Sequence, residues 1–226
     1  MNRDACGEKK HPSYMKTALF PAGRLFATRR NFESGFNAEE RRLAEAYLKR
    51  PCNVLIIGSG NGREARPISA DGHKIVCIDK VLLYLQCGQR LSAGEGMSDV
   101  GFLAADMHHL PFRKASFDFV FFSLYSIALD KRFEVIKEIR EILRPGGLIL
   151  LSADTTLHRS LYRHVKNLSY FIIDTVDDLQ KEVSQCGFDV LEGRVNPLRP
   201  EYLHAILRIS AGRQREGSLG EESRQR

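Results

Sequence analysis

The stretch NVLIIGSGNGRE, residues 53–64, runs from a mostly apolar segment straight into a loop with glycine at every second position. Its first part, NVLIIG, has the continuous apolar character of a strand that is buried on both faces of a sheet. Gly58, Gly60 and Gly62 then allow the backbone to come close to a bound ligand. The stretch therefore predicts a buried strand followed by a ligand-binding turn.

Two classes of enzyme build such a turn: dinucleotide-dependent oxidoreductases and S-adenosylmethionine-dependent methyltransferases. The dinucleotide fingerprint is Gly-x-Gly-x-x-Gly, and Arg63 occupies the position of its third glycine. Asp79, which closes the second predicted strand, fits both classes, because a carboxylate there accepts hydrogen bonds from ribose hydroxyls. The turn and Asp79 alone therefore leave both classes open.

Strands and helices alternate from residue 53 onward. Strands are predicted at residues 53–58, 74–79, 101–106, 116–123 and 146–154, with helices at 63–72, 81–93 and 131–143 between them. A further helix precedes the first strand, with Asn37 as its cap, Glu40 completing a capping box and Pro51 ending it. Such alternation is typical of a mostly parallel sheet with helices on both faces.

The C-terminal part differs from this alternation. A helix capped by Thr175 and stopped by Gly187 precedes two predicted strands, 188–195 and 201–210, which are too close in sequence for a crossover helix and should pair antiparallel. We therefore predict an α/β fold, a Rossmann-like doubly wound sheet of seven strands in the order 3-2-1-4-5-7-6 with one antiparallel strand.

Three regions are expected along the chain. Residues 1–36 are an N-terminal arm or lid, residues 37–210 form the domain, and residues 211–226 are a charged, Gly/Ser-rich disordered tail. Aromatic and basic residues within 14–36 and 155–171 predict that these two segments close over the pocket of an acceptor molecule. The alternatives are that the first segment is a loose arm and the second a helix packed on the surface.

Three motifs downstream of the turn separate the two enzyme classes. They are Asp106-x-x-x-Leu-Pro-Phe after the third predicted strand, Phe117-Asp118-x-Val in the fourth, and Leu143-x-Pro-Gly-Gly before the fifth. With the glycine turn and Asp79, this combination resembles the class I S-adenosylmethionine-dependent methyltransferase family. The resemblance is to its small-molecule branch, which includes the quinone C-methyltransferases, and it covers residues 53–153 best.

The resemblance implies S-adenosyl-L-methionine as the cofactor and gives its residues roles by position. The loop of Gly58, Ser59, Gly60 and Gly62 would pass under the methionine and ribose portions. Asp79 would hold the ribose hydroxyls, and Lys80 with Val81 would border the adenine. Asp106 would accept from the adenine amine, the Met107 amide would reach a ring nitrogen, and Ser123 would face the methionine portion. No metal is implied.

One position departs from the family pattern. The family often has an acidic residue two positions before the first glycine, where it helps to anchor the amino end of the cofactor, and this chain has Ile56 there. Arg63, Glu64 and an arginine from residues 24–30 are the alternative substitutes.

The sequence identifies no catalytic residue. A general base is needed only when the acceptor must lose a proton. Candidates are His108 and His109 after Asp106, and His158 and His164 in the possible lid. Tyr125 could orient an acceptor or simply pack, and His204 lies in a predicted strand and is interpreted as structural.

Composition limits the partners. The net charge of +6 is concentrated in residues 1–50, with 11 Lys and Arg against 6 Asp and Glu. Such a region can contact an anionic substrate or RNA, but it is more often a solvated arm, so nucleic acid is disfavoured as a partner but not excluded. The five scattered cysteines have no CxxC pair, which argues against disulfides and structural zinc. No apolar run reaches the ~20 residues of a membrane helix, and the polar N-terminus lacks the apolar core of a signal peptide, so a cytoplasmic location without membrane insertion is expected.

Three functions stay open at this point. A small-molecule methyltransferase is preferred, because the chain lacks both the Asn/Asp-Pro-Pro-Tyr/Phe motif of amino-directed enzymes and the paired cysteines of RNA 5-methylcytosine enzymes. The alternatives are an RNA or protein methyltransferase that uses the basic N-terminal region, and a non-catalytic methyltransferase-like binding protein. The sequence gives neither the acceptor nor the oligomeric state.

Overall fold

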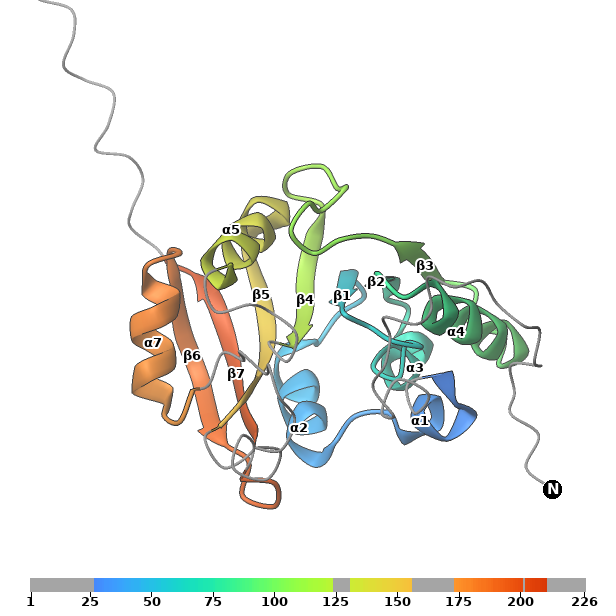
Figure 1. Ribbon diagram of the computed structural model, residues 1–226, viewed down its shortest axis with the longest axis horizontal. Coiled ribbons are helices and arrows are strands. Elements are labelled where there is room, and N and C mark those ends of the chain that lie inside the picture. The colour runs from blue at the N-terminus through green and yellow to red at the C-terminus, as the bar shows by residue number, and fades with distance from the viewer. Residues whose placement is uncertain (1–26, 124–130, 156–172, 201, 211–226) are drawn as a thin grey trace, which may run out of the picture.

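The computed structural model describes residues 27–123, 131–155, 173–200 and 202–210 (Figure 1). Within them lies a seven-stranded sheet in the order β3-β2-β1-β4-β5-β7-β6. Its strands are β1 (Asn53–Ile57), β2 (Lys74–Asp79), β3 (Val100–Ala104), β4 (Phe117–Ser123), β5 (Leu143–Asp154), β6 (Phe188–Val195) and β7 (Tyr202–Ile209). The predicted fold class and strand order are confirmed.

Strand directions also agree with the prediction. β1 pairs in parallel with both β2 and β4, and β2–β3 and β4–β5 are parallel as well. β7 is antiparallel to both of its neighbours, β5 and β6. The carboxyl ends of β1, β2, β3, β4 and β5 therefore lie at the same edge of the sheet, where open α/β sheets bind ligands.

The helices begin and end close to their sequence signals. They are α1 (Arg29–Ser34), α2 (Ala38–Tyr47), α3 (Ala65–Ile68), the 3-10 turn η3 (Ser69–Asp71), α4 (Leu82–Gly94), α5 (Arg132–Ile142) and α7 (Val176–Ser184). Asn37 and Glu40 form the predicted capping box of α2, and Thr175 caps α7. These caps satisfy backbone N–H groups that have no partner inside the helix.

Alternation along β1 divides the core between the two faces of the sheet. Leu55 and Ile57 pack in a cluster that includes residues of α5 and α7, whereas Val54 and Ile56 pack in a second cluster with residues of α2 and α3. All four side chains are at most 2% exposed. Because successive strand side chains point to opposite faces, β1 is a central, doubly covered strand.

Two of the motif positions stabilise the end of the sheet opposite the glycine loop. Asp118, in β4, accepts two hydrogen bonds from Arg144 Nη1 at 2.9 and 2.7 Å and a third from the Asn53 backbone N–H at 2.9 Å. This carboxylate therefore joins the starts of β1, β4 and β5. The Phe-Asp-x-Val and Leu-x-Pro-Gly-Gly motifs thus contribute to the framework of the sheet.

Candidate functional site

The glycine loop, residues 58–62, leaves the carboxyl end of β1. Gly58, Gly60 and Gly62 have φ angles of 69°, 55° and 80°, which glycine adopts without the strain that a side chain would cause. A Cβ atom built on Gly58 would meet no heavy atom of the described residues within 4 Å, whereas one on Gly62 would lie 3.0 Å from the Phe102 ring. Gly58 thus faces open space, and Gly62 allows the loop to pack against β3.

Asp79, the last residue of β2, holds this loop through its carboxylate. Its Oδ2 accepts a hydrogen bond from the Gly60 N–H at 2.9 Å, and its Oδ1 accepts one from the Val81 N–H at 2.8 Å. The Ser59 N–H donates to the Ile78 carbonyl at 3.0 Å and fastens the loop to β2 a second time. Since each carboxylate oxygen has further lone pairs, Asp79 is a rigidly oriented acceptor at the edge of the sheet.

Asn61, in the same loop, is fully buried and joins the loop to the N-terminal segment. Its Nδ2 donates to the Thr28 carbonyl, and its Oδ1 accepts from Asn31 Nδ2, both at 2.8 Å. Phe32 of α1 is completely buried in a cluster with Cys87 of α4. Residues 27–34, which belong to the predicted arm or lid, are therefore packed beside the glycine loop and α4.

Asp106 follows β3 and lies on the surface, with 61% of its side chain exposed. Its Oδ1 accepts from the His108 backbone N–H at 2.9 Å and lies 2.8 Å from His108 Nδ1. These two hydrogen bonds lower the pKa of Asp106 below its ordinary value. The backbone of this turn is tied to β2, since the Ala105 N–H donates to the Asp79 carbonyl at 3.2 Å.

A row of polar side chains crosses the sheet near its carboxyl edge. Ser123 on β4 is the register partner of Ser152 on β5, which in turn is the partner of His204 on β7. Ser152 Oγ lies 2.8 Å from His204 Nδ1. His204 Nε2 lies 3.5 Å from Asn37 Nδ2 at the start of α2. Burial lowers the pKa of His204, even though Glu40 acts in the opposite direction.

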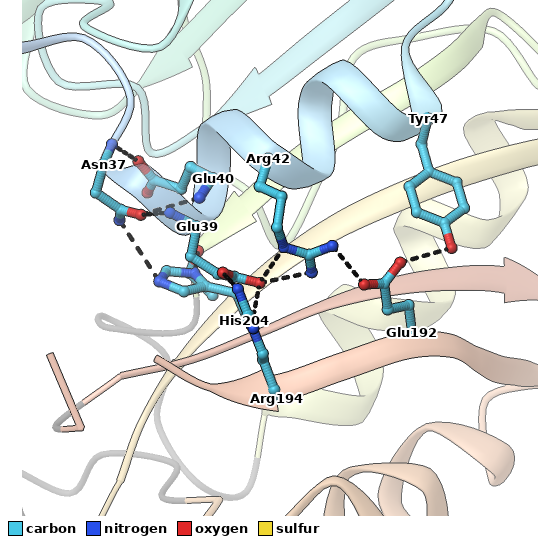
Figure 2. Close-up of polar contacts among 9 residues, drawn as sticks. Asn37, Glu39, Glu40, Arg42, Tyr47, Glu192, Arg194 and His204 are labelled. Atoms are coloured by element: carbon cyan, nitrogen blue, oxygen red, sulfur yellow. Dashed lines mark hydrogen bonds and ion pairs between the residues drawn. The ribbon is translucent and has the colours of Figure 1, made fainter. Parts of the chain in front are cut away.

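Figure 2 shows how α2 is held against β6 by charged side chains. Glu39 Oε1 accepts from Arg42 Nη2 at 2.6 Å and from Arg194 Nε at 2.9 Å. Glu192 Oε1 pairs with Arg42 Nη1 at 2.6 Å, and its Oε2 accepts from the Tyr47 hydroxyl at 3.0 Å. Burial opposes ionisation of Glu39, but the hydrogen bonds from Arg194 and Arg42 lower its pKa to about 2. This network fixes the position of α2.

The next residue of α2, Glu40, takes part in a second charged cluster beside the glycine loop. Arg63 Nη1 donates to Glu40 Oε2 at 3.0 Å, and Arg63 Nη2 donates to Glu40 Oε1 at 2.8 Å. The same Nη2 lies 2.9 Å from Glu64 Oε1. Burial raises the pKa of Glu64. Burial opposes ionisation of Glu40, yet Arg63 holds its pKa below the ordinary value.

A small hollow opens between this cluster and the ends of the central strands. It has two carboxylates and two hydroxyls in an otherwise apolar lining. The lining residues are Glu40, Ile56, Ile57, Glu64, Phe121, Phe122, Ser123, Leu150 and Ser152. The hollow therefore lies directly before Gly58, on the side of the loop that faces β4 and β5.

The predicted site residues fall into two groups in space. Hydrogen bonds join Gly60 to Asp79, and Ser123 lines the hollow beside the start of the loop. Asp106 lies farther out, after the edge strand β3, which is paired with β2. Lys80 is exposed, and Met107 is partly buried against the core. The predicted contacts of all these residues with a cofactor stay predictions.

Several other candidates lie outside the described residues: Tyr125, His158, His164 and the segments 14–26 and 156–171. Two residues of the hollow have roles that sequence reasoning missed. Glu40 shows the signal of a capping box, which conceals its pairing with Arg63, and Ser152 reaches the hollow because of its register with Ser123.

The described residues contain no helix that is long and apolar enough to cross a membrane. Within those same residues, no group of three or more His, Cys, Asp or Glu side chains is arranged to hold a metal ion.

Comparison with known proteins finds a family match in the central region of the chain. Residues 55–151 match the family described as "Methyltransferase domain". A carboxy-S-adenosyl-L-methionine synthase of Pseudomonas putida is 36% identical over 92 residues, which are 38% of this chain and 37% of that protein. The chain thus spans less than half the length of this curated relative.

Solved structures agree with the fold over a larger part of the chain. The 1,6-didemethyltoxoflavin-N1-methyltransferase of Burkholderia thailandensis, with bound 1,6-didemethyltoxoflavin and S-adenosylhomocysteine, superposes with a TM-score of 0.65 at 18% identity, covering 92% of this chain and 95% of that one. The PH0226 protein of Pyrococcus horikoshii gives 0.67 at 16% identity, covering 89% and 100%. The fold is that of class I S-adenosylmethionine-dependent methyltransferases.

Proposed function

We propose that this protein is an S-adenosyl-L-methionine-dependent methyltransferase that acts on a small molecule. The observation that carries the proposal is the joining of Asp79 to the glycine loop. Asp79 Oδ2 accepts from the Gly60 N–H at 2.9 Å, at the carboxyl ends of β1 and β2. A carboxylate fixed in this way is oriented to accept hydrogen bonds from a ribose, directly beside a loop that a ligand can approach.

The residues present fit the proposed cofactor. No heavy atom of the described residues lies within 4 Å of a Cβ built on Gly58, so a ligand could approach the loop backbone closely there. Asp79 would hold the ribose, while Lys80 and Val81 would border the adenine. Asp106, kept ionised by its hydrogen bonds from His108, would accept from the adenine amine. The Met107 amide would reach a ring nitrogen, and the loop residues Ser59, Gly60 and Gly62 with Ser123 would complete the site.

The protein's own contribution to the reaction is mainly positioning. When bound, the cofactor would supply an electrophilic methyl group on its sulfonium, and in-line attack by the acceptor on that methyl would release the sulfur as the neutral thioether of S-adenosylhomocysteine. Holding the acceptor close and aligned can supply most of the rate enhancement. Asp79 and the glycine loop would fix the cofactor, and Ser123 at the end of β4 would face its methionine portion and methyl group.

A small-molecule acceptor is favoured over a polymer. The fold superposes with an enzyme whose structure contains 1,6-didemethyltoxoflavin, over 92% of this chain. A second candidate reaction comes from the matched relative, which is named a carboxy-S-adenosyl-L-methionine synthase. In that case the chemistry would modify the cofactor itself. RNA or protein methylation remains the alternative for the basic residues 1–50.

A cytoplasmic location is part of this proposal, because five scattered cysteines without a CxxC pair are typical of proteins in reducing compartments. Of those that the structure describes, Cys77, Cys87 and Cys186 are buried, and burial raises the pKa of Cys77.

Two measurements test the proposed function. Isothermal titration calorimetry with S-adenosylhomocysteine is expected to show binding, and NADH is expected to show none, because Arg63 occupies the third-glycine position of the dinucleotide pattern. An acceptor screen that follows S-adenosylhomocysteine release, with mass spectrometry of the nucleoside product, then separates methyl transfer from carboxylation of the cofactor. Absence of binding to S-adenosylhomocysteine would refute the proposal.

A further inference from the structure

The charged cluster beside the glycine loop holds one more carboxylate than guanidinium. Glu40 and Glu64 both pair with Arg63, whose Nη2 lies 2.8 Å from Glu40 Oε1 and 2.9 Å from Glu64 Oε1. All three side chains are largely buried, with 4%, 13% and 22% of Glu40, Glu64 and Arg63 exposed. With both carboxylates ionised, these three residues carry a net charge of −1. A cation would complete the balance.

One oxygen of this cluster has no partner in the described structure. Glu64 Oε2 is buried, and no donor among the described residues hydrogen-bonds it. Leaving a buried polar atom without a hydrogen bond costs about 1–3 kcal/mol, and more when it is charged. In a native fold such an atom calls for a donor from outside the chain, which can be a bound water, an ion or a ligand group.

The hollow beside Glu64 restricts what that ligand can be. Ile56, Phe121 and Leu150 contribute apolar walls, and the carboxylates of Glu40 and Glu64 contribute the charge. Glu64 Oε2 requires an N–H or O–H donor, which a sulfonium does not have and a primary ammonium does. The hollow has room for about one water-sized group, and an ammonium group, which is of that size, satisfies the unpartnered oxygen.

The position of the hollow in the fold indicates which ligand carries this ammonium group. The hollow lies between the start of the glycine loop and Ser123, at the end where the amino-acid portion of the cofactor would lie. Ile56, at the position where the family often has an acid, lines the same hollow as Glu64. The carboxylate that the sequence lacks at residue 56 is thus present in the same space, contributed from beyond the loop.

We propose that Glu64 binds the α-ammonium group of S-adenosylmethionine, with Glu40 and Arg63 holding its carboxylate in place. This inference rests on the proposed function and assigns one of its binding residues. Arg63 is thereby a positioning residue, since its guanidinium contacts Glu64 Oε1 and leaves Oε2 directed elsewhere. Burial raises the pKa of Glu64, a cost that an ammonium partner would offset.

The test compares two protein variants with three ligands by calorimetry. The variants are Glu64→Gln, which keeps the shape and removes the charge, and Glu45→Gln on the exposed face of α2 as its matched control. The ligands are S-adenosylhomocysteine, its analogue with hydrogen in place of the α-amino group, and 5′-methylthioadenosine, which lacks the amino-acid portion.

For Glu64→Gln, affinity for S-adenosylhomocysteine is expected to fall about 10- to 100-fold, as for other hydrogen bonds between charged groups. The same variant should bind 5′-methylthioadenosine and the deaminated analogue as the wild type does, and Glu45→Gln should bind all three normally. Equal losses for all three ligands would show a structural role for Glu64 and overturn the inference, as would an unchanged affinity for S-adenosylhomocysteine.

The wild-type protein alone provides a second test that does not depend on the folding of a variant. It is expected to bind S-adenosylhomocysteine at least 10-fold more tightly than the deaminated analogue. Equal affinities would overturn the role of Glu64 while leaving the proposed function intact. Failure to bind any of the three ligands would instead refute the proposed function and this inference together.

Discussion

Ser152 and His204 are register partners on β5 and β7, and Ser152 Oγ lies 2.8 Å from His204 Nδ1 with both side chains buried. A neutral imidazole protonated at Nδ1 satisfies both of its contacts, donating to Ser152 and accepting from Asn37. Protonating the second nitrogen would place two donors face to face at Asn37. The fold therefore favours the neutral form of His204.

This arrangement predicts how stability depends on pH. Burial lowers the pKa of His204 in the fold below the ordinary value of 6.5, so the unfolded chain binds more protons than the folded one. The stability that neutral His204 contributes is therefore present above pH 6.5 and is lost as pH falls through 6.5. The groups facing it are Ser152, Asn37, Glu39, Glu40 and Arg63.

Urea unfolding between pH 5 and pH 8 measures this contribution as the difference between the wild type and His204→Gln. The difference in unfolding free energy should shrink as pH falls. Comparison of the two proteins is necessary because burial raises the pKa of Asp154 to about 7, which acts in the opposite sense. His109→Gln, which changes an exposed histidine, is the control. If His204→Gln and His109→Gln changed the unfolding free energy with the same dependence on pH, the prediction would be contradicted.

Asp79→Ala is expected to weaken binding of S-adenosylhomocysteine about 10-fold or more, because each hydrogen bond to a charged group contributes about 1.5–3 kcal/mol. Calorimetry on the folded variant provides the measurement. Asp99→Ala is the matched control, since Asp99 is an exposed aspartate that directly precedes β3. Unchanged affinity in Asp79→Ala would remove this residue from the site.

Gly62→Ala should lower the free energy of unfolding by about 1–3 kcal/mol, because a side chain is strained at positive φ. The angle at Gly62 is 80°, and the added Cβ would lie 3.0 Å from Phe102. Gly94→Ala, at the end of α4 with no heavy atom of the described residues near its Cβ, should be neutral or slightly stabilising. Urea denaturation compares the two, and equal effects would show that the loop tolerates a side chain.

Glu39→Gln is expected to lower the free energy of unfolding by about 1–3 kcal/mol, because it weakens the hydrogen bonds from two arginines to a buried carboxylate. This loss of stability is modest because solvent screens the two arginines: 37% of the Arg42 side chain and 49% of the Arg194 side chain are exposed. The expected loss should disappear in acid, as pH falls through the Glu39 pKa of about 2. Glu45→Gln is the control at an exposed site of the same helix.

The predicted N-terminal half of a lid calls for a shorter truncation than one at residue 36. Phe32 is fully buried, and Phe36 stacks on Phe121 with ring centroids 5.3 Å apart. Removing residues 1–26 keeps both contacts, whereas removing 1–36 would damage the core. If the lid exists, the shorter deletion should reduce turnover of an identified acceptor without lowering the unfolding midpoint, and undiminished turnover would contradict it.

Local patterns in the sequence predicted most of the fold. The apolar stretch 53–58 gave the central strand, Asn37 with Glu40 gave the start of α2, and the short spacing after Gly187 gave the antiparallel end of the sheet. Each of these depends on residues close together in the chain. That is why the strand order followed from them together with the handedness of crossover connections.

Contacts between distant segments were not predictable in the same way. Arg63 was considered as a ligand-binding residue, but it is engaged by Glu40, 23 residues earlier. His204 was interpreted as structural, yet its partner Ser152 is set by the register of two strands that are 52 residues apart. Phe32 was assigned to the arm or lid of residues 1–36, and the sequence did not reveal that it packs against α4. A pattern within one segment does not reveal which segment will cover it.

The hydrogen bonds of Asn61 couple the docking of the N-terminal helix α1 to ligand binding at the glycine loop. Because Asn61 holds both the Thr28 carbonyl and the Asn31 amide, the present loop conformation and the docked position of α1 favour each other. Linkage is reciprocal. A molecule that binds this loop conformation more tightly than the conformation without docked α1 must therefore stabilise the docked position of α1 by the same free energy. Protection of α1 from proteases or from hydrogen exchange would therefore report occupancy of a loop that it flanks.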